Sequence, residues 1–124
     1  MPAWTPEQVE AIASTDDFHI APYRADGATP GTLTWICSVV VDGSVYVCAY
    51  NGVSGRWYRS ALAQRAGKIT AADEEHEVSF APIDDQELND RIDRAYEAKY
   101  AGSAYLPPMV AERTRAATVR VDPR

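Results

Sequence analysis

The clearest pattern in the chain is a pair of apolar runs, "TLTWICSVVV" and "SVYVCAYN", separated by Asp42-Gly43. Asp-Gly between two such runs is typical of a β-hairpin with a two-residue turn. Alternation gives two faces that are both largely apolar: Trp35, Cys37, Val39, Val41, Tyr46, Cys48 and Tyr50 on one, and Ile36, Val40, Val45, Val47 and Ala49 on the other. A hairpin open to water on one side would carry polar residues there. We therefore expect barrel closure to cover one face and a helix or a second subunit to cover the other.

Three segments have the features of helices. The first begins at Pro6 after Thr5, an N-cap residue, and the second covers "RWYRSALAQRA" and is expected to end at Gly67. The third lies within residues 84–102 and is expected to start from a capping box at Asp84. An apolar stripe recurs at every fourth residue of the third helix: Leu88, Ile92, Tyr96 and Tyr100.

Shorter alternating segments predict four more strands, at residues 17–24, 68–73, 76–83 and 117–124. With the hairpin this makes about six strands, most of them sequential neighbours. Such an order favours an antiparallel β-barrel with peripheral helices over a wound α/β sheet. The expected fold class is therefore α+β, mainly β, in a single domain over residues 1–124.

Composition narrows the range of partners. The net charge of −6 disfavours non-specific binding to nucleic acid or to an anionic membrane surface. No apolar run approaches the length of a membrane span. The start "MPAWTPEQVE" has neither the basic head nor the apolar stretch of a signal peptide, so we expect a cytoplasmic protein.

The charges are unevenly distributed along this acidic chain. Between positions 24 and 68 there are five basic residues and two acidic ones: Arg24, Arg56, Arg59, Arg65 and Lys68 against Asp26 and Asp42. A locally positive middle would suit a small anionic ligand, and chance clustering accounts for it equally well.

The stretch "NGVSGR", residues 51–56, leads from a glycine-containing loop into the second helix. Free backbone N–H groups at a helix start attract anions, and Arg56 and Arg59 could clamp a phosphate from one side of that helix. The same residues also fit an ordinary helix start capped by Ser54 with solvated arginines. Both interpretations stay open.

The cysteines and histidines indicate no metal site. Cys37 and Cys48 lie at opposed positions of the hairpin, where a disulfide is conceivable, but a cytoplasmic setting favours reduced thiols. Neither these cysteines nor His19 and His76 have partners at ligand spacing. A lone histidine is weak evidence for a general base.

Several of these segments together, "YVCAYNG", "RWYRSAL", "IDRAYEAKY" and "TVRV", resemble a bacterial domain-of-unknown-function family, number 2255, over nearly the whole chain. That family is grouped with the FMN-binding split-barrel superfamily. The resemblance therefore implies an FMN-binding-like split β-barrel and, because superfamily members dimerise, a homodimer. More distantly, "YRADGATPGTLTW" and "RWYRSAL" are similar to the deazaflavin-dependent nitroreductases. There, the positions of Arg24 and Thr34 hold cofactor phosphates, and those of Trp57 and Leu62 are packing residues of the helix.

The resemblance implies a flavin- or deazaflavin-dependent oxidoreductase that acts on a small molecule, with FMN or a deazaflavin as cofactor. The expected phosphate anchors are Arg24, Thr34, Arg56, Arg59 and Lys68, and Trp35 and Trp57 would shape the ring slot. Trp35 opposite Tyr50 also fits a core aromatic pair. No catalytic acid or base is identified.

The alternative is a cofactor-free barrel that binds a small ligand or serves a structural role. The loop "YRADGATPG" favours it, because only the arginine and a later glycine remain of the glycine-arginine-x-serine-glycine run of the nitroreductases.

Overall fold

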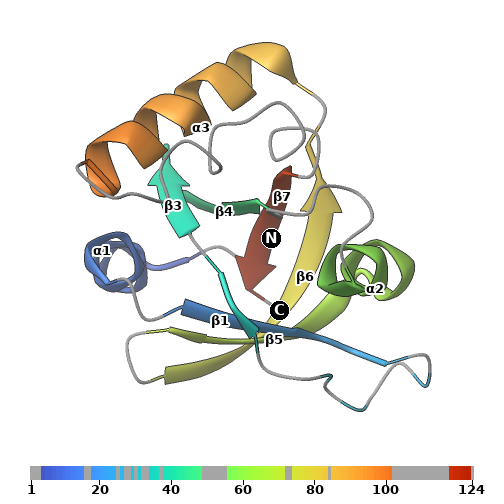
Figure 1. Ribbon diagram of the computed structural model, residues 1–124. Coiled ribbons are helices and arrows are strands. Elements are labelled where there is room, and N and C mark those ends of the chain that lie inside the picture. The colour runs from blue at the N-terminus through green and yellow to red at the C-terminus, as the bar shows by residue number, and fades with distance from the viewer. Residues whose placement is uncertain are drawn as a thin grey trace.

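The computed structural model describes residues 4–15, 18–24, 26, 29, 31, 34–36, 38–48, 56–71, 74–83, 85–101 and 118–123. Within these residues the fold is α+β and mainly β, an antiparallel half-barrel of seven strands with three helices around it (Figure 1). The helices are α1 Pro6–Ser14, α2 Arg56–Gln64 and α3 Gln86–Lys99. The strands are β1 Phe18–Pro22, β2 Thr34–Trp35, β3 Ser38–Val41, β4 Ser44–Cys48, β5 Ala66–Ala71, β6 Glu74–Pro82 and β7 Thr118–Pro123.

The chain connectivity forces the sheet to curl. Its strand order is β2-β1-β5-β6-β7-β4-β3, and every neighbouring pair is antiparallel. β2 and β3 are the two edge strands, yet only positions 36 and 37 separate them in the chain. In a flat sheet of this size the edges would lie roughly 29 Å apart. The link from Trp35 to Ser38 spans at most roughly 11 Å, so the two edges must approach each other.

The chain turns a corner at residues 36–37, where it passes from one sheet edge to the other, and this corner corrects the strand prediction. The run "TLTWICSVVV" divides into β2, which pairs with β1, and β3, which pairs with β4, so the strand count is seven instead of about six. Trp35 lies opposite His19, outside the hairpin, and 40% of it is exposed. The interpretation of Trp35 as a core partner of Tyr50 is therefore wrong. Alternation identifies an apolar run, but it does not show where that run leaves one edge of a sheet for the other.

The hairpin itself forms as predicted. Asp42 and Gly43 make its two-residue turn with φ values of 51° and 79°, and Val41 lies opposite Ser44. Positive φ at both turn positions is the reason for the Asp-Gly signal.

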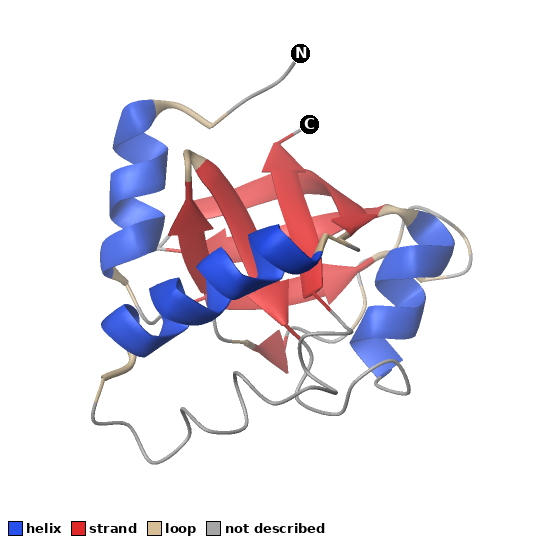
Figure 2. Ribbon diagram, turned by 90° about the horizontal axis from the view of Figure 1, so that it is seen from above, coloured by secondary structure: helices blue, strands red, loops and turns tan. Residues whose placement is uncertain are grey.

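Both faces of this hairpin are buried, also as predicted. Val45 and Val47 point into the main core inside the curl, which α1 and α2 help to close. The opposite face packs under α3 in a second core, formed by Val39, Val41, Tyr46, Ile92, Tyr96 and Tyr100. Figure 2 shows α3 lying across the strands. Because a helix of the same chain covers this face, the hairpin gives no reason for a second subunit, and the homodimer stays a prediction.

Two helix starts follow the predicted capping chemistry, one of them shifted by a residue. At α1 the Thr5 hydroxyl accepts a hydrogen bond from the Gln8 backbone N–H at 3.1 Å, and the Gln8 side chain accepts one from the Thr5 N–H at 2.9 Å. At α3 the N-cap is Asp85, whose carboxylate accepts from the Leu88 N–H at 3.1 Å. The prediction of Asp84 as N-cap is wrong, because spacing alone does not choose between adjacent aspartates.

The predicted end of the second helix is also wrong. α2 stops at Gln64, and Arg65 takes the left-handed conformation, with φ 57°, that was expected of a glycine. Gly67 instead lies inside β5, opposite Pro22 and Val78. A Cβ there would lie 2.6 Å from both the Ala21 carbonyl oxygen and the Pro22 Cα. Gly67 is therefore needed for the close approach of β1 and β5.

In the part of the chain that the structure describes, no helix combines the length and apolar character needed to cross a membrane. The cytoplasmic location stays a prediction.

Candidate functional site

Five of the seven predicted cofactor residues have described side chains: Arg24, Thr34, Trp35, Arg59 and Lys68. Arg56 and Trp57 belong to the first turn of α2, but their side chains lie outside the described residues. The loop at 51–55 lies outside them as well, so the predicted anion cradle at "NGVSGR" stays a prediction.

The strand register divides the predicted residues between two faces of the sheet. Thr34 lies opposite Ile20, whose side chain is buried in the main core. Trp35 lies opposite His19, on the outer face, and Lys68, opposite Ala21, shares that outer face across β1. The structure therefore brings Trp35 and Lys68 to one face and places Thr34 on the other.

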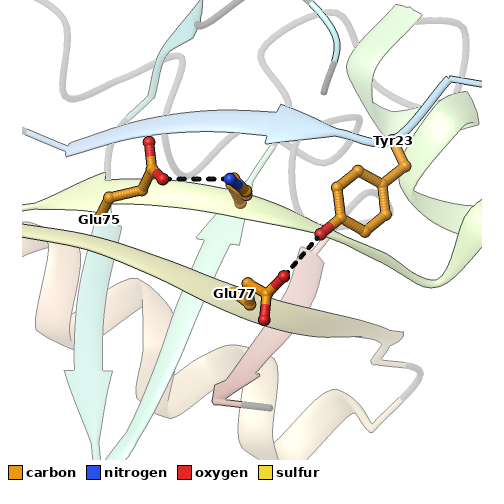
Figure 3. A network of polar contacts seen from close by, with 4 residues as sticks. Tyr23, Glu75 and Glu77 are labelled. Carbon is orange, nitrogen blue, oxygen red and sulfur yellow. Dashed lines mark hydrogen bonds and ion pairs between the residues drawn. The ribbon is translucent and has the colours of Figure 1, made fainter. Parts of the chain in front are cut away.

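Lys68 is engaged by carboxylates. Its ammonium donates a hydrogen bond to Glu75 on β6 at 3.2 Å, and the neighbouring Glu77 accepts one from the Tyr23 hydroxyl at 3.4 Å (Figure 3). The hydrogen bond to Glu75, together with that residue's charge, raises the pKa of Lys68 above its ordinary value. A phosphate at Lys68 would therefore compete with Glu75 for the ammonium.

The positive charge counted between residues 24 and 68 is partly offset by these carboxylates. β6 pairs with β5, so two acidic residues that follow Lys68 in the sequence return beside it on the outer face, Glu75 and Glu77. Arg65 also has a local role, because its Nε donates to the Leu62 carbonyl at the end of α2 at 3.0 Å. In space, part of the positive charge inferred from the sequence is therefore offset or used to end a helix.

Arg24 and Arg59 differ from those two cations. Both are exposed, and within the described residues neither guanidinium has an ion-pair partner. Arg24 follows Tyr23, whose N–H donates to the carbonyl of Ala66, and α2 runs directly into Ala66 through Arg65. The end of β1 and the C-terminal end of α2 therefore meet at one end of the barrel (Figure 1). Arg24 lies at this end, and Arg59 lies on α2 five residues before the helix ends at Gln64.

The structure also shows a cavity that sequence reasoning missed. It has a volume of about 330 Å³ and lies between α1 and the ends of β5 and β6 that carry Ala71 and Glu74. His76 lines it, with its Nε2 3.5 Å from the Glu74 carboxylate.

Trp4 also contacts the His76 ring. The Trp4 ring packs edge-on against the imidazole at a centroid distance of 5.3 Å, and the Trp4 indole N–H donates to the Val121 carbonyl at 2.9 Å. In the sequence His76 looked isolated. One signal was present, since Glu74 and His76 are two apart on a strand and so share a face. No local pattern pointed to Trp4, which lies near the N-terminus, far from His76 in the sequence.

A serine and a lysine also lie together, but their arrangement is structural. Lys99 at the end of α3 donates to the carbonyl of Ser38 at 2.8 Å and lies 3.4 Å from its hydroxyl. It also reaches the Ile12 carbonyl near the end of α1 at 3.4 Å. Ser38 is fully buried, so no substrate can reach its hydroxyl. The ammonium instead joins two helices to the start of β3.

Within the described residues no group of three or more histidine, cysteine, aspartate or glutamate side chains is placed to hold a metal ion. Cys37 and the side chain of Cys48 lie outside those residues, so their redox state stays a prediction.

Comparison with known proteins now identifies the family. A family model described as "Uncharacterized protein conserved in bacteria (DUF2255)" matches residues 8–121. The chain belongs to this family. No curated protein is similar enough to count as a match.

Among solved structures, this DUF2255 chain is similar to the crystal structure of the conserved hypothetical protein Rv2991 from Mycobacterium tuberculosis. The superposition has a TM-score of 0.62 at 16% sequence identity and covers 97% of this chain and 79% of that one. At this identity the likeness supports a common fold and carries no information about activity.

Proposed function

We propose that this DUF2255 protein is an FMN-binding-like split barrel that binds a flavin or deazaflavin and acts as an oxidoreductase on a small molecule. The observation that carries the proposal is that Arg24, which follows β1, and Arg59, on α2, are both exposed in an acidic protein and have no ion-pair partner among the described residues. A phosphate group would form charge-assisted hydrogen bonds with such guanidinium groups.

The exposed indole of Trp35 supports the ring part of the proposal. Trp35 is opposite His19, five residues before Arg24 along the β1 direction, which corresponds to roughly 16 Å. A flavin mononucleotide carries its flat ring and its phosphate at opposite ends, so it matches an aromatic surface and an arginine that are well separated. Thr34 and Lys68 are secondary candidates, since one shares the face of Ile20 and the other is bound to Glu75.

When bound, the cofactor would supply the redox chemistry. The residues of this chain would bind its phosphate through Arg24 and Arg59 and orient its ring through Trp35.

The test is a titration of the purified protein with FMN and, separately, with a deazaflavin, followed by visible absorbance and tryptophan fluorescence. Arg24→Ala combined with Arg59→Ala should weaken binding by about 2–4 kcal/mol if both phosphate contacts are lost. Arg94→Ala, an exposed arginine on α3, is the matched control and should leave affinity unchanged. An unresponsive wild type, or equal affinities for the double variant and the control, would overturn the proposal.

The second candidate is a cofactor-free binding or structural module. The engagement of Lys68 by Glu75 favours it, because it removes one expected anchor. This candidate predicts no spectral change with either cofactor. The homodimer is a separate part of the proposal and rests on the family resemblance, so light scattering of the purified protein tests it directly.

A further inference from the structure

The cavity beside α1 is a candidate binding site that is separate from the proposed cofactor surface. Its strand residues Ala71, Glu74 and His76 belong to the face of the sheet that turns toward α1. Trp35 on β2 and Lys68 on β5 lie on the outer face of the same sheet. The volume of about 330 Å³ is at the lower end of the range for small-molecule sites.

The charges around the cavity select the sign of a ligand. Its ionisable lining residues are Glu7, Glu74 and His76, and no lysine or arginine is among the described residues that line it. An anion would therefore meet two carboxylates, whereas a cation would gain an attractive interaction with each. The partial positive charge at the start of α1 offsets only part of the charge of Glu7.

The remaining lining groups define the shape and polarity of the ligand. Ala11, Ile12 and Ala71 supply an apolar wall, and Ile12 and Ala71 are almost fully buried. The Thr5 and Gln8 side chains also line the cavity, but each accepts a backbone hydrogen bond within the α1 cap. The carboxylates and the imidazole are thus the groups that remain for recognition.

The position of His76 is set by its neighbours. Trp4 packs edge-on against the ring, and Glu74 lies 3.5 Å from Nε2. A fixed imidazole beside a carboxylate offers a cation with N–H groups a further acceptor when it is neutral.

We infer that this cavity binds a small organic cation, a primary amine or guanidinium compound with a short aliphatic part. Glu7 and Glu74 act as its counter-ions, His76 accepts a hydrogen bond from it, and Ala11, Ile12 and Ala71 contact its aliphatic part. This inference does not depend on the proposed redox function.

NMR titration of the full-length protein tests the charge requirement. Butylamine and butylguanidine are the probes, and butanol and butyrate are the neutral and anionic controls. The cations should shift backbone amide signals of α1, β5 and β6, and Glu7→Gln with Glu74→Gln should weaken their binding about tenfold or more. Glu10→Gln is the matched control, an exposed α1 glutamate outside the lining, and should bind like the wild type.

A second variant tests the cavity with its charges intact. Ala11→Leu adds a larger side chain at the lining and should abolish the shifts, while Ala13→Leu, an exposed α1 alanine outside the lining, should not. Thermal unfolding confirms beforehand that each variant is folded. The inference is wrong if the wild type binds neither cation up to roughly 10 mM, if butanol or butyrate binds equally well, or if the variants bind like their controls.

Discussion

The β3–β4 hairpin and the β5–β6 hairpin belong to one curled sheet, yet they are covered differently. In β3–β4 both faces are buried: Val45 and Val47 face the main core, while Val39 and Tyr46 pack under α3. In β5–β6 only the inner face is buried, through residues such as Ile69 and Val78. Its outer face carries Lys68, Thr70, Glu75 and Glu77, which are exposed or half-buried.

In each hairpin, a face made of apolar residues is covered by another layer of the protein, and a face made of polar residues is not. Where both faces are apolar, a second layer is required, and the stripe of α3 supplies it. Where apolar and polar residues alternate, one face remains available for ionisable groups. For this reason Lys68, Glu75 and Glu77 come from the outer face of β5–β6, and the described part of β3–β4 offers no comparable exposed group except at its turn.

The largest expected effect comes from removing the second cover. Tyr96 is fully buried between α3 and the hairpin, so Tyr96→Ala should lower the free energy of unfolding by about 3–5 kcal/mol. Thr70→Ala, on the outer face of β5, should cost less than about 1 kcal/mol. Urea denaturation measures both. Equal effects would show that α3 is not an essential cover of the hairpin.

The next effect concerns the covered side of β5–β6. Gly67→Ala places a Cβ against the backbone of Ala21 and Pro22, which cannot move without separating β1 from β5. We expect a loss of about 1–3 kcal/mol in the free energy of unfolding. The midpoint of urea denaturation measures it. A neutral substitution would contradict the close approach of the two strands.

A smaller effect is expected where the hairpin turn meets α3. Asp42 forms an exposed ion pair with Arg91, and Asp42→Asn removes the charge while keeping a residue that tolerates positive φ. The expected loss is about 0–1 kcal/mol, and it should shrink with added salt. A loss that rivals that of Tyr96→Ala would mean that the ion pair, and not the apolar stripe, holds α3 on the hairpin.

The smallest effect at neutral pH is expected at Tyr58, on the face of α2 that closes the main core. Burial raises the pKa of Tyr58, and the charge of Arg65 opposes this in part. The unfolded chain therefore loses this proton first, near pH 10, while the folded protein keeps it. Its stabilising contribution is complete below that pH and is lost as the pH rises through the folded pKa.

Urea denaturation at neutral pH and above pH 10 checks this at Tyr58. The free energy of unfolding of the wild type should fall more between the two conditions than that of Tyr58→Phe, because the other tyrosines contribute equally to both proteins. Parallel falls would show that the Tyr58 hydroxyl is not shielded from water.

Much of the local structure could be predicted from short-range chemistry. The α1 capping box, the turn at Asp42-Gly43 and the stripe of α3 all depend on residues within a few positions of each other, and each was confirmed. The errors occurred where equivalent local choices competed. Asp85 replaced Asp84 as a cap, and Arg65 took the conformation expected of Gly67.

The candidate sites depended more on distant contacts. The charge of Lys68 could be counted, but its partner Glu75 comes from the next strand. The cavity around His76 requires α1 and the sheet together, and Trp4 packs against His76 while it donates to Val121 at the other end of the chain.

The amino-acid sequence by itself determined that the hairpin at 38–48 needs two covers, because its alternating side chains are apolar on both faces. Only the tertiary structure decided that α3 is the second cover, that the run at 34–41 turns a corner, and that His76 lines a cavity. The reason is physical. Alternation and capping are properties of neighbouring residues, whereas covers, corners and cavities arise from contacts between segments that meet only when the sheet curls.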